Sequence, residues 1–155
     1  MLRLSKKTDY ALLAVRHLAA NADRGAVSAR ELAETYDIPA ELLAKVLQKL
    51  VRGKLLESHQ GIRGGYALAR TPASMSVADV IEAVDGPLMV TACSEDDHTC
   101  EQYAKCNIRD PLWRIKDRIV ATLAATSVAE LAMEAARPAP PLGSDAVPIQ
   151  IVRRT

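Results

Sequence analysis

Between residues 28 and 70 the sequence passes from a helical period to a strand period, and this ordered change restricts the fold more than any other feature. Ser28 and Glu31 form a capping-box pattern, which predicts a helix from Ser28 to about Tyr36. Pro39 suits the first position of a second helix, because its missing N–H would be unpaired there in any case. That helix is expected to end at Gly53 and to bury a leucine-rich side. Two helices joined by so short a turn predict a helix-turn-helix.

A glycine-rich hairpin is expected directly after these helices. Residues 55–60 and 66–70 have the pattern of two short strands, and the glycine-rich stretch 61–65 forms the tip between them. A hairpin in this position is the wing of a winged helix. A further helix over residues 5–21, capped by Ser5, is predicted to precede the pair. The predicted fold class is therefore mainly α, a winged helix-turn-helix with a long C-terminal dimerisation helix.

The dimerisation helix is predicted from Pro111 to about Ala136, after a short helix over Ser76–Val84 and a cysteine segment over residues 91–110. One side of the long helix is apolar, and the chain offers no evident partner for it, so we expect a homodimer. The residues of this stripe are Leu112, Ile115, Ile119, Val120 and Leu123.

Three regions follow from these elements. Residues 1–72 are predicted to be the winged helix-turn-helix DNA-binding domain. Residues 73–136 hold the cysteine cluster loop and the dimerisation helix. Residues 137–155 are rich in proline and are expected to form a disordered tail.

The charge of the chain is distributed unevenly. Residues 1–72 hold 12 Lys and Arg against 7 Asp and Glu, whereas residues 73–111 hold 2 against 8. A basic segment of domain size favours double-stranded DNA as a partner, because Lys and Arg displace counterions from phosphate. The sequence contains no run of 18 apolar residues and its start lacks a signal-peptide core, so a cytoplasmic protein that does not enter membranes is expected.

The second helix of the helix-turn-helix is predicted to enter the major groove, and the wing tip to reach a neighbouring minor groove. Lys45 and Gln48 can donate to base edges, and Arg63 between glycines suits the minor groove. The predicted DNA-binding residues are Lys45, Gln48, Lys49, Arg52, His59 and Arg63, of which Lys49, Arg52 and His59 would meet phosphates. Taken one by one, the same residues would fit the solvated side of an amphipathic helix.

The only three cysteines, Cys93, Cys100 and Cys106, lie within 14 residues. An odd number in a cytosolic chain argues against a disulfide framework, and their spacing lacks the C-x2-C pair expected of a zinc finger. Three thiolates on one loop suit an iron–sulfur cluster. The fourth ligand stays open among Glu95, Asp96, His98, Glu101 and Asp9.

An enzyme is the other class that the cysteines allow. His98 beside Cys100 could form a nucleophile pair. However, no glycine loop for an oxyanion and no orienting acid lies in recognisable context nearby, so we do not expect an enzyme.

Several motifs together carry a family resemblance. They are LRLSKKTDYALLAVRHLA, SHQGIRGGYALAR, SVADVIEAVDGP and the three-cysteine loop before PLWRIKD. In this order they resemble the IscR/NsrR/RirA family of winged helix-turn-helix iron–sulfur transcription regulators, over residues 1 to about 135. The opening, the stretch Thr91–Cys93 and the Trp113-Arg114 pair are most similar to SufR-type regulators of the SUF system.

The resemblance implies a homodimer in which Cys93, Cys100 and Cys106 hold the cluster and cluster occupancy controls DNA binding. The position of the fourth, histidine ligand of IscR is Arg109 here, which cannot bind iron. Asp9 matches the NsrR pattern, in which the partner subunit donates an aspartate. A four-iron four-sulfur cluster is favoured over a two-iron two-sulfur cluster.

The function predicted from the residues and the resemblance is a DNA-binding regulator, such as a repressor, of iron–sulfur assembly genes. Its signal would be cluster status, redox state or nitric oxide. The alternative is a thiol- or zinc-dependent regulator of the same fold without a cluster.

Overall fold

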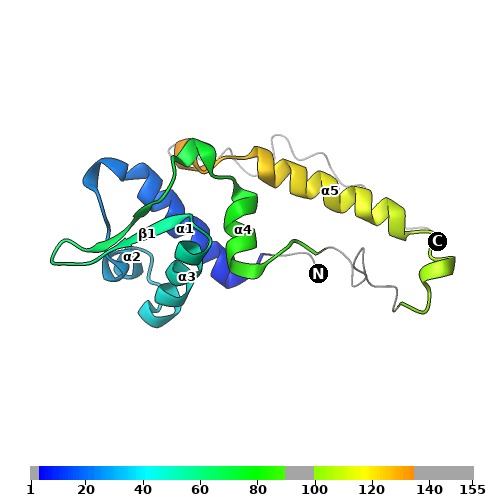
Figure 1. The fold of residues 1–155 in the computed structure, drawn as a ribbon, viewed down its shortest axis with the longest axis horizontal. Helices are drawn as coiled ribbons and strands as arrows, with labels where there is room; N and C mark the ends of the chain where they lie inside the picture. Colours follow the sequence, from blue (N-terminus) through cyan, green and yellow to red (C-terminus); the bar gives the residue numbers. More distant parts are fainter. Residues whose placement is uncertain (1–3, 90–99, 135–155) are drawn as a thin grey trace, which may run out of the picture.

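The computed structural model describes residues 4–89 and 100–134. Its elements are, in chain order, α1 (Lys6–Ala20), η1 (Ala22–Arg24), α2 (Ala29–Thr35), α3 (Ala40–Arg52), β1 (Leu56–His59), β2 (Gly65–Leu68), η2 (Pro72–Ser74), α4 (Val77–Asp85), η3 (Tyr103–Lys105), α5 (Arg109–Ala125) and α6 (Val128–Glu134). The helices α1 to α4 and α6 form one body with the hairpin at its edge, and α5 extends away from that body (Figure 1). The predicted class, mainly α with a winged helix-turn-helix, is confirmed.

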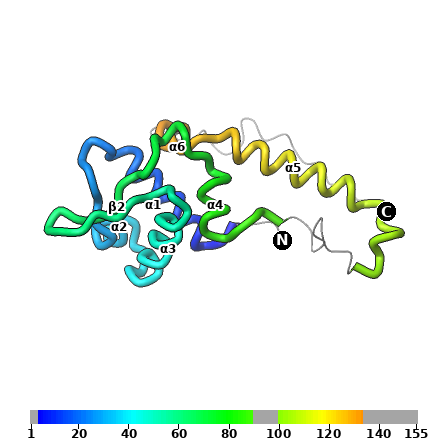
Figure 2. Tube along the Cα trace, in the orientation of Figure 1, coloured from blue at the N-terminus to red at the C-terminus, as the bar shows by residue number. Residues whose placement is uncertain are grey.

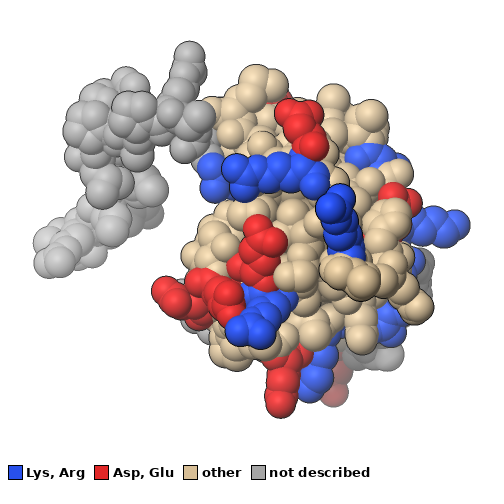
Figure 3. All heavy atoms as spheres, turned by 90° about the vertical axis from the view of Figure 1, so that its left-hand side faces the viewer, with Lys and Arg blue, Asp and Glu red and all other residues tan. Residues whose placement is uncertain are grey.

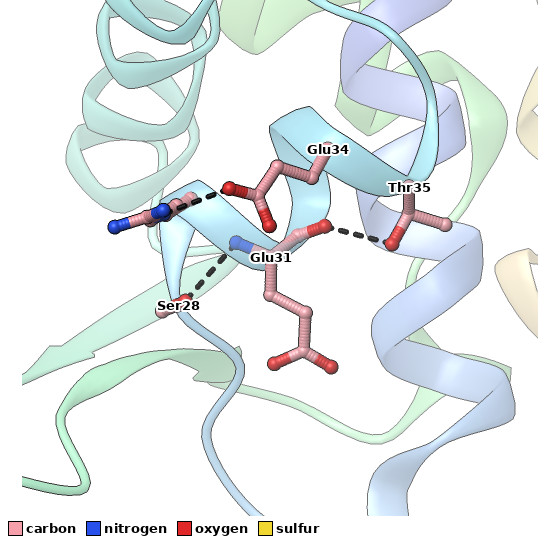
Figure 4. Close-up of polar contacts among 5 residues, drawn as sticks. Ser28, Glu31, Glu34 and Thr35 are labelled. Carbon is pink, nitrogen blue, oxygen red and sulfur yellow. Dashed lines mark hydrogen bonds and ion pairs between the residues drawn. The ribbon is translucent and has the colours of Figure 1, made fainter.

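The helix starts follow the capping signals in the sequence. Ser5 caps α1, and the Ser28 hydroxyl accepts a hydrogen bond of 3.1 Å from the Glu31 amide at the start of α2 (Figure 4). A capping box with both hydrogen bonds forms at α4, between Ser76 and Asp79. The position predicted for Pro39 was wrong by one residue. Pro39 has a ψ of 122°, outside the helical range, and is therefore the N-cap of α3 rather than its first residue.

The helix-turn-helix turns at Asp37, whose φ of 51° is left-handed, and Ile38 then returns to the core. The apolar sides of α1, α2 and α3 pack together in one hydrophobic core. Among its fully buried side chains are Val15, Leu32, Leu43, Val46, Leu47 and Leu50. Gly53 ends α3 as predicted, with a φ of −74°. A Cβ at Gly53 would lie 2.9 Å from that of Ala83, so this glycine lets α3 and α4 approach each other.

The wing is an antiparallel hairpin in which Leu56 pairs with Leu68 and His59 with Gly65. It is joined to the residues before α2, because Val27 and Tyr66 exchange backbone hydrogen bonds of 3.0 and 2.8 Å. A Cβ on Gly65 would lie 2.4 Å from the Val27 carbonyl oxygen, so only glycine permits this approach. The base of the wing is therefore fixed to the helix-turn-helix.

The long C-terminal helix was predicted as one piece to about Ala136, and this was wrong. The helix α5 ends at Ala125, and the chain then runs extended beside the residues before α4. The Val77 amide donates to the Thr126 carbonyl at 2.9 Å, and the Val128 amide donates to the Met75 carbonyl at 2.8 Å. A second helix, α6, starts there and packs against α1.

The core formed around the helix-turn-helix therefore continues beyond residue 72. Met75, Val80, Val84 and Val128 are buried in the same cluster as the helix-turn-helix residues. The tube in Figure 2 shows how α5 connects the far end of the molecule with α6, which lies back at the main body. The proposed tail, residues 137–155, lies outside the described residues.

None of the side chains of α5, all of which are described, is buried. Ile115 is 46% exposed and Ile108, just before the helix, is 60% exposed. Across residues 4–89 and 100–134, no helix has both the length and the apolar character that crossing a membrane would need.

Candidate nucleic-acid interface and cysteine segment

The outward side of α3 is polar and largely basic. Lys45, Gln48 and Arg52 are exposed on it, at a spacing that places them on one face of the helix. The opposite side is held by Leu43, Val46, Leu47 and Leu50 in the core. The structure thus brings three of the predicted DNA-binding residues onto one accessible helix face.

Lys49 is placed differently from these three. It is half-buried, and its ammonium group donates a hydrogen bond to the backbone carbonyl of Val84 in the last turn of α4. Its role in contacting phosphate stays a prediction, because its hydrogen-bond partner lies in α4 and not on the outer face of α3. No local pattern predicts this contact, because the two residues are 35 positions apart.

A cavity of about 230 Å³ opens beside α3 and the first turn of α1. We call it the basic pocket. It is lined by Lys7, Lys45, Val46, Gln48, Lys49 and Arg52. Lys7 was missed by the sequence analysis, because its position next to α3 depends on how α1 and α3 pack.

The wing tip carries the two other predicted residues. Arg63 is exposed at the tip, next to Ile62, whose side chain is fully exposed. His59 lies at the end of β1, and its Nε2 is 3.0 Å from the Glu57 carboxylate. That carboxylate would compete with a phosphate for the imidazole. Arg63 is therefore the wing cation with the freer approach to DNA.

The face of the molecule that Figure 3 shows carries basic and acidic side chains interspersed, not a uniform basic surface. One acidic group of the helix-turn-helix is Glu34, whose carboxylate pairs with Arg30 at 2.8 Å on the surface of α2 (Figure 4). The local arrangement of charged side chains, rather than the net charge of residues 1–72, therefore decides where an anion can bind.

Two of the three cysteines lie among the described residues. Cys100 is exposed and Cys106 is half-buried, and neither is in a disulfide. They flank η3, where the Tyr103 amide donates to the Cys100 carbonyl at 2.9 Å. Two accessible thiols at the ends of one turn are suitable donors for a soft metal or an iron–sulfur cluster.

The remaining candidate ligands are not brought together in the described part of the chain. Cys93 and the loop candidates Glu95, Asp96 and His98 lie outside it. Among the described residues, no three His, Cys, Asp or Glu side chains gather as a metal site would need. Asp9 is exposed on α1 and lies 3.9 Å from the Lys6 ammonium.

Arg109 joins η3 to the start of α5. Its guanidinium lies 4.4 Å from the ring centre of Tyr103 and 5.4 Å from that of Trp113. It also pairs with Asp110 at 2.7 Å. This hydrogen bond is the main reason why the pKa of Arg109 is raised and that of Asp110 lowered. Arg109 therefore fixes the end of the cysteine segment against α5.

The end of α4, just before the cysteine segment, is tied to two other helices. The buried Thr8 of α1 donates to the Asp85 carboxylate, and Lys49 of α3 donates to the Val84 carbonyl. Burial alone would raise the pKa of Asp85. Hydrogen bonds from Ser5 and Thr8, with the charge of Lys49, outweigh burial and hold that pKa below its usual value.

Comparison with known proteins gives consistent matches over most of the chain. The profile of the Rrf2 family, described as an iron-dependent transcriptional regulator, matches residues 4–134. BadM of Rhodopseudomonas palustris, named as an HTH-type transcriptional regulator, is 39% identical over 131 residues, covering 84% of this chain and 81% of BadM. IscR of Escherichia coli, an HTH-type transcriptional regulator, is 31% identical over 131 residues, covering 84% of this chain and 80% of IscR.

The solved structure of CymR, the global cysteine regulator of B. subtilis, is similar with a TM-score of 0.70 and 27% identity, covering 86% of this chain and 98% of CymR. These proteins are described as regulators and not as enzymes, as the sequence analysis predicted. The resemblance to IscR is confirmed. The closer similarity to SufR-type regulators stays a prediction.

Proposed function

Because this chain belongs to the Rrf2 family of transcriptional regulators, we propose that it binds a double-stranded DNA operator and senses iron–sulfur cluster status. In this proposal α3 enters the major groove, where Gln48 and Lys45 reach base edges and Arg52 meets a phosphate. Arg63 at the wing tip enters the neighbouring minor groove.

The observation that carries the DNA-binding part is the outer face of α3. Lys45, Gln48 and Arg52 are exposed there, and the helix is held from behind by four fully buried aliphatic side chains. A helix anchored in this way can present polar groups to a groove without exposing apolar surface. The fixed base of the wing then holds Arg63 at a defined distance from α3.

The proposal includes a homodimer formed through α5. Leu112, Ile115 and Ile119 share one side of this helix, and none of them is buried in a single chain. An uncovered apolar stripe of this kind is typical of an interface. Two copies joined along α5 would present two α3 helices, as a two-fold symmetric operator requires.

The sensing part of the proposal rests on the cysteines. Cys93, Cys100 and Cys106 would hold the cluster, with Asp9 of the partner as fourth ligand, and a four-iron four-sulfur cluster is favoured over a two-iron two-sulfur cluster. Oxygen, nitric oxide or a shortage of iron can alter or remove an iron–sulfur cluster, which would make it the sensing group. The protein would act in the cytoplasm, as a repressor of iron–sulfur assembly genes or of a related regulon.

The coupling between the two parts is proposed to run through the end of α4. Val84 and Asp85 form the end of α4, which precedes the cysteine segment, and they contact α3 and α1. A change in the segment that moves this end of α4 would shift α3 through Lys49. The acidic loop itself need not touch DNA for this to happen.

The first experiment is a visible absorption spectrum of protein purified without oxygen. Thiolate-bound iron gives strong visible absorption, so the wild-type protein is expected to be brown. Serine substitution of Cys93, Cys100 or Cys106 should remove the colour while far-ultraviolet circular dichroism stays unchanged. A colourless wild-type protein after reconstitution with iron and sulfide would contradict cluster binding.

A second candidate function is regulation through zinc or through the thiols alone. It is favoured by the similarity to the solved structure of CymR, a global cysteine regulator. The same purification separates the two candidates. Stoichiometric zinc in a colourless protein, or DNA binding that follows thiol oxidation without any metal, would support the second candidate.

A further inference from the structure

We propose that the basic pocket beside α3 seats one backbone phosphate of DNA, and that Lys7 of α1 is a DNA-contacting residue. This inference rests on the proposed DNA-binding function and adds a residue from outside the helix-turn-helix. It also moves Lys45 from a base edge to the phosphate next to it.

The pocket lies between the first turn of α1 and the C-terminal half of α3. The two helices are neighbours in the fold (Figure 1). Four of its six lining residues are Lys or Arg, and the remaining two are Gln48 and Val46. No carboxylate of the described residues lines it. A cavity with this lining favours an anion over a neutral or cationic group.

Two acids near these helices, Asp9 and Asp85, have partners of their own. Asp9 lies 3.9 Å from the Lys6 ammonium, and Asp85 accepts a hydrogen bond from Thr8. Lys49 donates to the Val84 carbonyl, so it contributes its charge to the pocket while its position stays fixed. Lys7, Lys45 and Arg52 are exposed and can turn toward a bound oxygen.

The size and place of the pocket fit a phosphate on the edge of a groove. Its volume of about 230 Å³ exceeds that of a single water, which occupies about 30 Å³ in the liquid, so a phosphate with part of its hydration can enter. When α3 lies in the major groove, the DNA backbone that borders the groove passes along the side of α3. Cations from two helices at that edge would fix the register of α3 on the duplex.

The test compares Lys7→Gln with Lys6→Gln in the full-length protein. Lys6 is the adjacent lysine in the same helical turn, it is exposed, and it does not line the pocket. Binding of operator DNA and of unrelated duplex DNA is measured by fluorescence anisotropy over a range of salt concentrations. One lost phosphate contact reduces the slope of log K against log salt by about 0.9.

We expect Lys7→Gln to weaken binding to both DNAs by roughly five- to tenfold at 0.1 M salt and to reduce the salt slope by about one. Lys6→Gln should change the affinity less than twofold. The double variant Lys7→Gln/Lys45→Gln should lose less affinity than the two single losses combined, because both residues contact the same phosphate.

Three results would overturn the inference in different ways. If the wild-type protein binds DNA but Lys7→Gln behaves like Lys6→Gln, the Lys7 assignment fails and the proposed function stands. If the wild-type protein binds none of the DNAs at any salt concentration, both fail. If Lys7→Gln abolishes binding of inorganic phosphate while DNA affinity is unchanged, the pocket is a site for free phosphate.

Discussion

The Thr8 hydroxyl donates a hydrogen bond of 2.6 Å to the Asp85 carboxylate, 77 residues further along the chain. Thr8 is fully buried in the first turn of α1, and Asp85 is the last residue of α4. The bond therefore fixes the point at which the chain leaves the DNA-binding body for the cysteine segment. The same turn of α1 carries Lys7 and Asp9.

Replacing Thr8 by valine should lower the free energy of unfolding by about 1–2 kcal/mol, because a buried hydroxyl loses its bond to a charged acceptor. The measurement is urea unfolding followed by circular dichroism. Thr35→Val is the matched control, because the Thr35 hydroxyl is exposed and bonds only to the Glu31 carbonyl of its own helix. It should cost less than about 0.5 kcal/mol. Equal losses for the two variants would show that the bond to Asp85 contributes nothing measurable.

Asp85 should make stability depend on pH in a defined direction. The pKa of Asp85 is lower in the folded protein than its usual value of 3.8. The ionised carboxylate therefore stabilises the fold at pH values above 3.8. This stabilisation is lost as the pH falls through the lower pKa of the folded state. Asp85→Asn should therefore cost about 1 kcal/mol at pH 7, a modest amount because the side chain is exposed to solvent. Unfolding at pH 7, 5 and 3 should show the cost shrinking only below about pH 4. A cost that is constant over this range would mean that packing, not charge, is responsible.

Lys49 is expected to couple the cysteine segment to DNA binding. Lys49→Met keeps the aliphatic stem but removes the hydrogen bond to the Val84 carbonyl. The ratio of DNA affinities between cluster-loaded and cluster-free protein, which in coupled systems is typically 5–150-fold, should fall toward one. Lys45→Met is the control, because Lys45 is exposed on the outer face of α3. Lys45→Met should lower the DNA affinity of the cluster-loaded and cluster-free proteins equally. If Lys49→Met also lowers both affinities equally, this coupling route is excluded.

The apolar side of α5 should decide the oligomeric state. Ile115→Glu places a charge in the proposed interface and should give a monomer at micromolar concentration in light scattering. Ala121→Glu is the control, because at roughly 100° per residue Ala121 lies about 120° from Ile115, on the side away from Leu112, Ile119 and Leu123. It should remain a dimer. A monomeric wild-type protein would mean that this interface does not exist. A dimer that tolerates Ile115→Glu would mean that the interface lies elsewhere.

Much of the fold was predictable because its signals are local. Ser5, Ser28 and Ser76 mark helix starts through hydrogen bonds to residues three positions later, so the sequence alone contains both partners. The wing was predictable for the same reason, from alternation around a glycine-rich tip. The break between α5 and α6 was missed because the extended pairing of Thr126 with Val77 depends on a distant segment. One local signal could have found it, the capping box of Ser127 and Glu130.

The candidate site was less predictable than the fold. The exposed face of α3 followed from helical spacing, and Lys45, Gln48 and Arg52 lie on it. The partner of Lys49 and the place of Lys7 follow from helix packing, which no pattern within one helix contains. The contacts of Arg109 with Tyr103 and Trp113 became evident only from the structure.

The most direct test of the central claim is the affinity of the wild-type protein for promoter DNA with and without its cluster. The titration uses protein purified without oxygen, the same protein after removal of iron, and the Cys106→Ser variant, all at one salt concentration. We predict that the two wild-type forms differ in affinity at least about tenfold on one promoter, and that Cys106→Ser behaves like the iron-free form whatever its treatment. Equal affinities of all three proteins for every promoter tested would contradict it.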